Sequence, residues 1–538
     1  MSGLLGGFVL GWSLLLLALS SPSVMVSAAP EAERAVLEAH PAVSEADTLR
    51  AFPPVGRSAV EALTFPPVDF APPRAREHEI LGVPVYHLHD PSLPLVDVFV
   101  QVRGGISHFP REDGPALTAL SSLIRNGGTT TLPPDSVDAR LDLLALQLSV
   151  GSGGGGAFAA LNSLTGTLDP ALGLLQEMLL RPGFDPEAIE VWRGQELERI
   201  RRREDDPGSL AYGEFNRLMF GDHPVGWVFT EAEVAAPPEG HETGSGAAAS
   251  GEGDPLARAR LERLHRRIYC RENLIVGVAG DLSWEDAESR MEAFLREWPP
   301  CPEPLAAPPT PELRREGGVF ILPREVEQTT VILAGPGGLR QEDSPEFFAS
   351  RIADFILGSG GFTSRVFSRI RTERGIAYGA SSLWTTPVRY EGLVGVVTAT
   401  RPERAVEAVE LIHEILEDFR SAPPRDDEVA LALEQIVNGY VFAFESASQI
   451  VGRRMGDRAQ GLADEWLERY LEGIQTVTPE RILEVSRRYI QPGEMTLLLV
   501  GDAARFAPGL EAFGPVYRLS TDGSYEPWEA EEDPAPGS

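Results

Sequence analysis

Histidine is the residue type through which this chain would most directly bind a metal ion, because an imidazole nitrogen is a common zinc ligand. None of its nine histidines forms His-x-x-Glu-His or His-Glu-x-x-His, the helical spacings that place two imidazoles on one zinc ion. His87 and His89 are two residues apart, so on a strand their side chains would share one face, with Asp90 beside them. This pattern is more typical of a polar strand face than of a metal site. The nine are His40, His78, His87, His89, His108, His223, His241, His265 and His413.

Serine and cysteine chemistry is equally unsupported. No Gly-x-Ser-x-Gly turn is present, so the sequence offers no serine nucleophile of the hydrolase type. The two cysteines, Cys270 and Cys301, lack catalytic surroundings and are too few for a disulfide framework or a cysteine-rich zinc module. In an oxidising compartment they could pair with each other, and the sequence leaves that question open.

The charge balance excludes another class of function. Of 538 residues, 47 are Lys or Arg and 80 are Asp or Glu, which gives a net charge of −33. A nucleic-acid-binding protein is expected to carry a basic patch, so we predict no nucleic-acid partner. The hydrophobic fraction of 43% is that of an ordinary globular protein. The length predicts roughly three or four domains.

The N-terminus predicts export. Leu4 to Leu19 is an apolar run, and the Val26-Ser27-Ala28 that follows is typical of a signal-peptide cleavage site. We therefore predict a signal peptide over residues 1–28 and a periplasmic or secreted protein. An uncleaved membrane anchor is the alternative, although the run is shorter than the roughly 20 residues that span a bilayer. No later segment is apolar enough to span one.

Two halves of the chain resemble each other. Arg266 and Asp281 lie 15 residues apart (281 − 266) around an apolar strand, and Arg487 and Asp502 repeat this spacing (502 − 487). Amphipathic helices precede the closing strand, for example over 405–419, where apolar residues recur at helical spacing. Strands, then helices, then a strand in each half predict an α+β fold class with two tandem homologous αβ domains.

Composition marks the boundaries of these domains. A Gly- and Pro-rich stretch over 237–254 is typical of a solvated loop, and the prolines that crowd 299–312 are typical of an extended linker. The predicted organisation is a signal peptide at 1–28, a Pro-rich lead-in at 29–75, an N-terminal domain at 76–298, a linker at 299–312, a C-terminal domain at 313–510 and an acidic tail at 511–538.

Four stretches carry a resemblance to a known family. The most specific runs from Gly360 to Phe367 and on to Arg371, Gly375 and Tyr378. The chain resembles the pitrilysin or insulinase-type metallopeptidases (inverzincins), and among them the half-length subunits of the processing-peptidase kind. The resemblance covers about residues 77–502 and implies two domains that form half of a clamshell chamber for unfolded or short peptides. The other stretches are Gly82–Tyr86 with Pro94–Val96 and Gly104-Gly105, Asp205–Pro207 with Asn216–Leu218 and Gly221–Pro224, and the two Gly-Asp strand ends.

The zinc motif of that family is missing. Active members bind zinc through His-x-x-Glu-His on a helix, with a further Glu roughly 70 to 80 residues later. The matching helix has Leu117, Leu120 and Ser121 in place of the first His, the base Glu and the second His. Leucine has no lone pair and a lone serine hydroxyl is a poor zinc ligand, so we predict no metal or cofactor bound by this chain. Near the third-ligand position the spacing does not choose among Glu190, Glu196 and Glu198.

The resemblance implies that another part of the active site is retained. In the family, an Arg and a Tyr seven residues later bind the substrate carbonyl or its oxyanion, and Arg371 and Tyr378 match them (378 − 371 = 7). A guanidinium fork and a phenol both stabilise developing negative charge. Apart from the motif, Arg371 would more simply pair with an acid on a helix and Tyr378 would be a core residue. Within the motif, the functional role is favoured.

The leading hypothesis is an exported, non-metal-binding subunit of a peptidase that is inactive alone. It would contribute Arg371 and Tyr378 in trans, with half of the chamber, to a homologous zinc-bearing subunit that hydrolyses peptides. The alternative is a catalytically inactive scaffold or peptide-binding protein of the same fold. Nothing in the sequence supports an autonomous peptidase. The run Gly151–Gly156 falls where the family places a chamber-lining strand, and the sequence leaves its role open.

Overall fold

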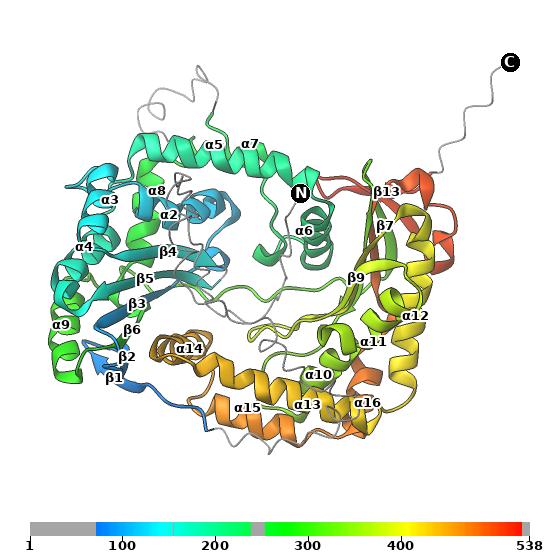
Figure 1. Ribbon diagram of the computed structural model, residues 1–538. Helices are drawn as coiled ribbons and strands as arrows, with labels where there is room; N and C mark the ends of the chain where they lie inside the picture. The colour runs from blue at the N-terminus through cyan, green and yellow to red at the C-terminus, as the bar shows by residue number, and fades with distance from the viewer. Residues whose placement is uncertain (1–70, 154, 238–252, 530–538) are drawn as a thin grey trace, which may run out of the picture. The chain divides into compact units, whose positions relative to one another are not determined.

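The computed structural model describes residues 71–153, 155–237 and 253–529. The predicted signal peptide, most of the lead-in, His40 and His241 lie outside the described residues. From Pro72 onward the described residues belong to one compact unit, which contains two β-sheets with their helices (Figure 1). None of the described helices is long and apolar enough to cross a membrane.

The first sheet comes from the N-terminal half and has the strand order β1-β2-β6-β3-β5-β4. Only β2 and β6 pair in parallel, and the remaining neighbours are antiparallel. β6 is apolar throughout and almost entirely buried, which is typical of a strand covered on both faces. The strands are β1 (Arg76–Ile80), β2 (Val83–His89), β3 (Leu95–Arg103), β4 (Gln147–Gly153), β5 (Gly156–Leu164) and β6 (Leu274–Gly280).

The second sheet comes from the C-terminal half, with the order β13-β12-β7-β11-β8-β10-β9. β11 is buried along its whole length and pairs in parallel with β7, as β6 does with β2 in the first sheet. The predicted α+β class with two αβ halves is confirmed. The strands are β7 (Gly318–Pro323), β8 (Thr329–Pro336), β9 (Ala377–Trp384), β10 (Leu393–Thr400), β11 (Thr496–Gly501), β12 (Val516–Leu519) and β13 (Tyr525–Pro527).

The helices cover these sheets. Helix α12 contains the predicted segment 405–419, and α16 begins at Pro479, whose fixed φ suits a first helical turn. In the N-terminal half they are α2 (Gly114–Asn126), α3 (Pro134–Leu143), α4 (Leu168–Leu180), α5 (Pro186–Arg202), α6 (Pro207–Phe220), α7 (Glu231–Val234), α8 (Arg258–Ile268) and α9 (Trp284–Arg296). In the C-terminal half they are α10 (Pro345–Asp354), α11 (Arg365–Phe367), α12 (Ala405–Ser421), α13 (Asp426–Val441), α14 (Ala447–Gln460), α15 (Trp466–Gln475) and α16 (Pro479–Tyr489).

Each half lends one helix to the sheet of the other. α14 packs on β6 and β2 of the first sheet (Figure 1), and α6 packs on β8 and β11 of the second. Gly277 in β6 makes the first contact possible, because a Cβ there would overlap Val451 and Met455 of α14. In the second contact Leu210 and Phe215 of α6 belong to the apolar core of the second sheet. The core of the second sheet therefore includes residues of the N-terminal half.

The second half extends further than predicted. We expected it to end at residue 510 and an acidic tail to follow, but β12 and β13 pair at the edge of the second sheet beside β7. The reason is aromatic packing: Tyr517 and Tyr525 both lie against the ring of Phe320 in β7, at centroid distances of 5.2 and 5.1 Å. The acidic composition of this segment had predicted a tail, because composition does not show which rings meet in the folded chain.

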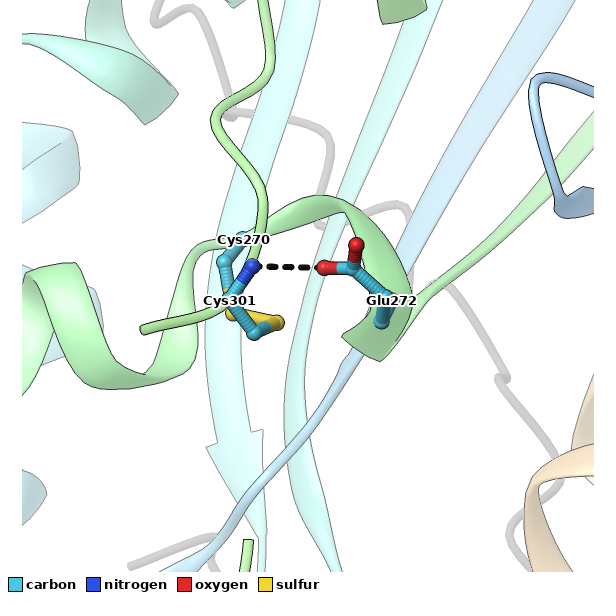
Figure 2. Close-up of side chains that lie close together, drawn as sticks. All are labelled: Cys270, Glu272 and Cys301. Carbon is cyan, nitrogen blue, oxygen red and sulfur yellow. Dashed lines mark hydrogen bonds between the residues drawn. A yellow bond between two sulfur atoms is a disulfide. The ribbon is translucent and has the colours of Figure 1, made fainter. Parts of the chain in front are cut away.

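The proline-rich segment 299–312 contains no helix or strand and is bound along its length to the N-terminal half. Cys270 forms a disulfide with Cys301, and the Glu272 carboxylate accepts a hydrogen bond from the Cys301 amide at 2.6 Å (Figure 2). Further on, the His108 and His223 rings hydrogen-bond the carbonyls of Ala306 and Pro309, at 2.7 and 3.0 Å. This segment is thus an ordered strap.

Candidate functional site

Arg371 and Tyr378 lie together on the C-terminal half. Arg371 belongs to a π-helical segment, Ser368–Glu373, and Tyr378 is the second residue of β9. Between them Gly375 has φ 58°, a left-handed conformation that favours glycine and turns the chain from helix to strand. The Arg371 guanidinium carbon lies 4.3 Å from the centroid of the Tyr378 ring, and 73% of Tyr378 is exposed. Tyr378 is therefore no core residue.

Aromatic rings hold the Arg371 guanidinium. Its carbon lies 4.9 Å from the Phe367 centroid and 5.4 Å from that of Phe362, which is 74% exposed. Within the described part of the chain no carboxylate lies close enough to form an ion pair with Arg371, whereas its neighbours Arg365 and Arg369 are both paired with acids. Because rings attract a cation through their faces, they position Arg371 without neutralising its charge.

This arrangement can bind an anionic or strongly polarised oxygen. The guanidinium offers N–H donors in a planar fork, and the exposed phenol of Tyr378 offers a hydroxyl. The structure places these two residues side by side, and their role stays a prediction. Sequence reasoning passed over Phe362 and Phe367 as binding partners, although both belong to the motif that carried the resemblance.

Leu117, Leu120 and Ser121 are buried on α2, where the family's zinc ligands would stand. They line a cavity of about 220 Å³ with residues of β4, β5 and α8. Two leucines and a serine provide no set of donors for zinc, so the residues present do not fit the metal. Among the described residues, the single group of three potential ligands close enough to share a metal ion is Cys270, Glu272 and Cys301, whose two sulfurs form the disulfide (Figure 2).

The three candidate third ligands on α5 differ in burial, and none lines this cavity. Glu190 and Glu198 are exposed and pair with Arg193 and Arg202 on the same helix. Glu196 is buried, and its carboxylate accepts a hydrogen bond of 2.7 Å from Arg199. Glu196 is therefore the one buried carboxylate of the three, and the family's third-ligand position is not assigned among them.

His87 and His89, the pair considered as a weak metal site, differ in burial. His87 is buried and its Nε2 hydrogen-bonds the carbonyl of Leu282 at 2.9 Å, while the exposed His89 lies 3.7 Å from Asp281. Burial lowers the pKa of His87, which favours the neutral ring. His223 caps the short turn that begins at Pro224, so its role there is structural.

Comparison with known proteins finds a matching family model and several relatives. A family model described as the peptidase M16 inactive domain matches residues 255–436. An uncharacterized zinc protease of Streptomyces coelicolor is 27% identical over 327 residues, which cover 59% of this chain and 66% of that protein. The non-peptidase homolog YmxG of Helicobacter pylori is 21% identical over 426 residues, which cover 78% of this chain and 92% of that protein. The chain thus spans about two thirds of the zinc protease's length.

Solved structures show the same fold. A peptidase M16 inactive domain from Pseudomonas fluorescens superposes with a TM-score of 0.67 at 22% identity, covering 79% of this chain and 98% of that one. A protease from Helicobacter pylori also has a TM-score of 0.67, at 15% identity and with coverages of 80% and 99%. At such identities the likeness speaks for the fold, and it confirms the predicted architecture of two αβ halves.

Proposed function

Because the chain is a half-length member of the M16 peptidase family and carries its inactive domain, we propose that it is the non-metal-binding subunit of an exported peptidase. Its partner is a homologous subunit that holds the zinc ion. The observation that carries the proposal is a combination: the zinc-ligand positions hold Leu117, Leu120 and Ser121, while Arg371 keeps an unpaired charge beside the exposed Tyr378.

Arg371 and Tyr378 act on the oxygen of the peptide bond. A zinc ion held by the partner would supply the activated water. The guanidinium fork of Arg371 donates hydrogen bonds to the substrate carbonyl as negative charge develops on it, and the Tyr378 hydroxyl donates a second one. The rings of Phe362 and Phe367 lie against the guanidinium and offer no hydrogen-bond acceptor, so its N–H groups remain available to the substrate.

Relatives of both kinds support a division of labour within the family. One relative is named an uncharacterized zinc protease and another a non-peptidase homolog, so both kinds of name occur among the matches. The disulfide between Cys270 and Cys301 supports export, because such bonds persist in oxidising compartments.

The test is reconstitution with a zinc-bearing relative from the same organism. Co-purified subunits should cleave a quenched fluorescent peptide, while each subunit alone should not. Arg371→Ala should lower kcat about 100-fold to 1,000-fold, and Tyr378→Phe about 10-fold to 100-fold, because each removes a donor to the developing oxyanion. The control is Arg374→Ala, an exposed arginine directly after the same segment, and this variant should cleave like the wild type. Unchanged cleavage in both Arg371→Ala and Tyr378→Phe would sink the in-trans role.

A peptide-binding protein without a catalytic partner is the second candidate. It is favoured by the cavity at α2 and by β4, which ends the first sheet and has no further strand beside it among those described. If the chain purifies without a partner, binds peptides and stimulates no cleavage by a zinc-bearing relative, this second function replaces the first. N-terminal sequencing of the exported protein, expected to begin at Ala29, tests the signal peptide.

A further inference from the structure

Tyr378 lies at an irregular point of β9. Thr398 of β10 is opposite Ala380, whereas Thr400, two residues further along β10, is opposite Ala377, three residues back along β9. Between these two pairs β9 therefore has one residue more than β10 (380 − 377 = 3 against 400 − 398 = 2), which makes a β-bulge. A bulge interrupts the ladder and turns a side chain to a new direction. The exposed Tyr378 lies within this bulge.

Two threonine hydroxyls of β10 hold the backbone on either side of Tyr378. The Thr398 hydroxyl donates a hydrogen bond of 2.8 Å to the carbonyl of Gly379. The Thr400 hydroxyl donates one of 2.7 Å to the carbonyl of Ile376. Both threonines are buried, so water does not compete for these hydrogen bonds and they restrain the backbone strongly.

The same contacts reach the segment that carries Arg371. The amide of Ile376 donates a hydrogen bond of 2.9 Å to the carbonyl of Ile370. The amide of Gly375 donates one of 3.2 Å to the carbonyl of Arg371. Thr400 thus holds a residue, Ile376, that is itself bonded to the π-helical segment of Arg371. The two threonines therefore restrain both ends of the stretch between Arg371 and Tyr378.

We propose that Thr398 and Thr400 are positioning residues, whose hydroxyls fix the bulge of β9 and thereby keep the Tyr378 phenol against the Arg371 guanidinium. The proposal rests on the proposed function, because it concerns the same pair, and it adds the two residues that set the geometry of that pair. Both threonines are buried, so they act through the backbone of β9 rather than by contact with the substrate. A donor displaced by 1 Å can cost about 100-fold in rate.

Valine and serine separate the hydroxyl from the shape of the side chain. Thr398→Val and Thr400→Val keep the branched shape and remove the hydroxyl, whereas Thr398→Ser and Thr400→Ser keep the hydroxyl and remove the methyl group. The valine variants should lower kcat of the reconstituted pair about 5-fold to 50-fold with little change in KM, because Tyr378 acts on the charge that develops during the reaction. The serine variants should keep the wild-type kcat.

Thr329 of β8 provides the matched control. It lies opposite Thr400 on the other side of β10, it is buried, and its hydroxyl forms no hydrogen bond with the described residues. Thr329→Val removes a buried threonine hydroxyl beside the same residue and should leave kcat unchanged. A loss of kcat in Thr329→Val as large as in Thr400→Val would mean a general weakening of the sheet and overturns the proposal.

A measurement on the isolated full chain follows Tyr378 itself. A fluorotyrosine incorporated at this position gives one fluorine NMR resonance, whose chemical shift depends on the contact between the ring and the Arg371 guanidinium. Arg371→Ala defines the resonance of a ring without that contact. Thr398→Val and Thr400→Val should move the resonance toward this position, while Thr329→Val should leave it in place. A resonance unmoved in both threonine variants of β10, with native circular dichroism, overturns the proposal.

A double variant tests whether Thr398 acts through Tyr378. In the Tyr378→Phe background, Thr398→Val should lower kcat further by less than about 2-fold, because the hydroxyl that it positions is already absent. A further loss as large as in the wild-type background overturns the route through Tyr378.

The outcome is distinguishable from failure of the proposed function, because the fluorine measurement needs no zinc-bearing subunit. A resonance that moves in the valine variants, with a reconstituted pair whose cleavage is indifferent to Arg371→Ala, overturns the proposed function and leaves the geometric role of the threonines in place. Partner-dependent cleavage that needs Arg371, together with an unmoved resonance, overturns the positioning role alone.

Discussion

At the scale of the residue, the chain exchanges one kind of chemistry for another. Leu117, Leu120 and Ser121, at the positions of the zinc motif, carry no strong donors, and the carboxylate of Glu196 on α5 accepts a hydrogen bond from Arg199. Arg371, by contrast, is held by rings and keeps its charge. A guanidinium is chosen over an ammonium where a planar fork must meet a planar acceptor and lie against aromatic faces.

A substitution at Arg371 that keeps the charge tests this difference. Arg371→Lys should lose most of the partner-dependent cleavage that Arg371→Ala loses, because a lysine lacks the planar fork and fits the three rings poorly. The measurement is kcat of the reconstituted pair. Full activity of Arg371→Lys would show that a positive charge alone is sufficient.

Metal content gives a second prediction at this scale. After dialysis against excess zinc and then buffer, the isolated chain should retain well under one zinc ion per chain by atomic absorption. A chelator should leave its melting temperature unchanged, since no metal contributes to folding. One tightly held zinc ion per chain would contradict the prediction that the positions of Leu117, Leu120 and Ser121 bind no metal.

At the scale of the element, the exchange of α6 and α14 ties the two halves together. The two contacts solve the same packing problem differently: Gly277 of β6 makes room for Val451 and Met455, whereas Leu498 of β11 shares a core with Leu210 and its neighbours on α6. Close packing makes such pairs sensitive to a change in volume on either side.

Gly277→Val should therefore destabilise the protein by about 1–3 kcal/mol, because its side chain overlaps α14. Urea unfolding followed by circular dichroism measures the loss. Val451→Ala in the same chain should recover part of it, as expected for residues in contact. Gly452→Ala is the control, since a Cβ there meets no atom within 4 Å. A loss that Val451→Ala leaves unaltered would contradict the contact.

A buried carboxyl lies in α6 near its contact with the second sheet. Glu214 is 1% exposed, with Arg217 at 3.3 Å and Arg203, Arg324 and Asp522 as the other charged neighbours. Both carboxyl oxygens lack a hydrogen bond to the described residues. Burial raises the pKa of Glu214 to about 7, from an ordinary value of 4.5, because desolvation outweighs the arginines.

The sign of the pH effect follows from linkage. Below pH 4.5 the Glu214 carboxyl is protonated in both states; between 4.5 and 7 only the unfolded chain ionises, so the free energy of unfolding falls as pH rises, by about 3 kcal/mol in all. Glu214→Gln should remove this fall. Melting temperatures of the variant and the wild type should therefore diverge from pH 5 to pH 7 in favour of the variant. Parallel curves over that range would contradict the raised pKa, and the exposed Glu198→Gln serves as control.

At the scale of the whole molecule, ion pairs and the disulfide differ in how much they stabilise the fold. All 47 basic residues are arginines, and the chain contains no lysine. Many form surface ion pairs with the excess of acids, each contributing little to stability. The disulfide between residues 31 apart in sequence is a stronger restraint, because it lowers the conformational entropy of the unfolded chain. It also links segment 299–312 covalently to the N-terminal half.

Removing this disulfide should be measurable. Cys270→Ser with Cys301→Ser should lower the free energy of unfolding by about 2–4 kcal/mol, given the loop it closes. Guanidinium titrations with and without a reductant measure the effect, and the reductant should not alter the double variant. A wild-type protein whose stability is indifferent to the reductant would contradict a structural role for the bond.

The sequence by itself determined the α+β class, the two similar halves, the family resemblance and the lack of a His-x-x-Glu-His motif, because these depend on residue types and on spacing within one helix or strand. The tertiary structure decided the rest: which rings surround Arg371, that Cys270 meets Cys301, that Glu196 is the buried carboxylate and that β12 and β13 join the second sheet. Each of these depends on contacts between separate elements, and their energies come from volumes and burial that appear only once the elements have packed. For the same reason the cavity beside β4 could not be predicted from the residue types at the zinc-motif positions.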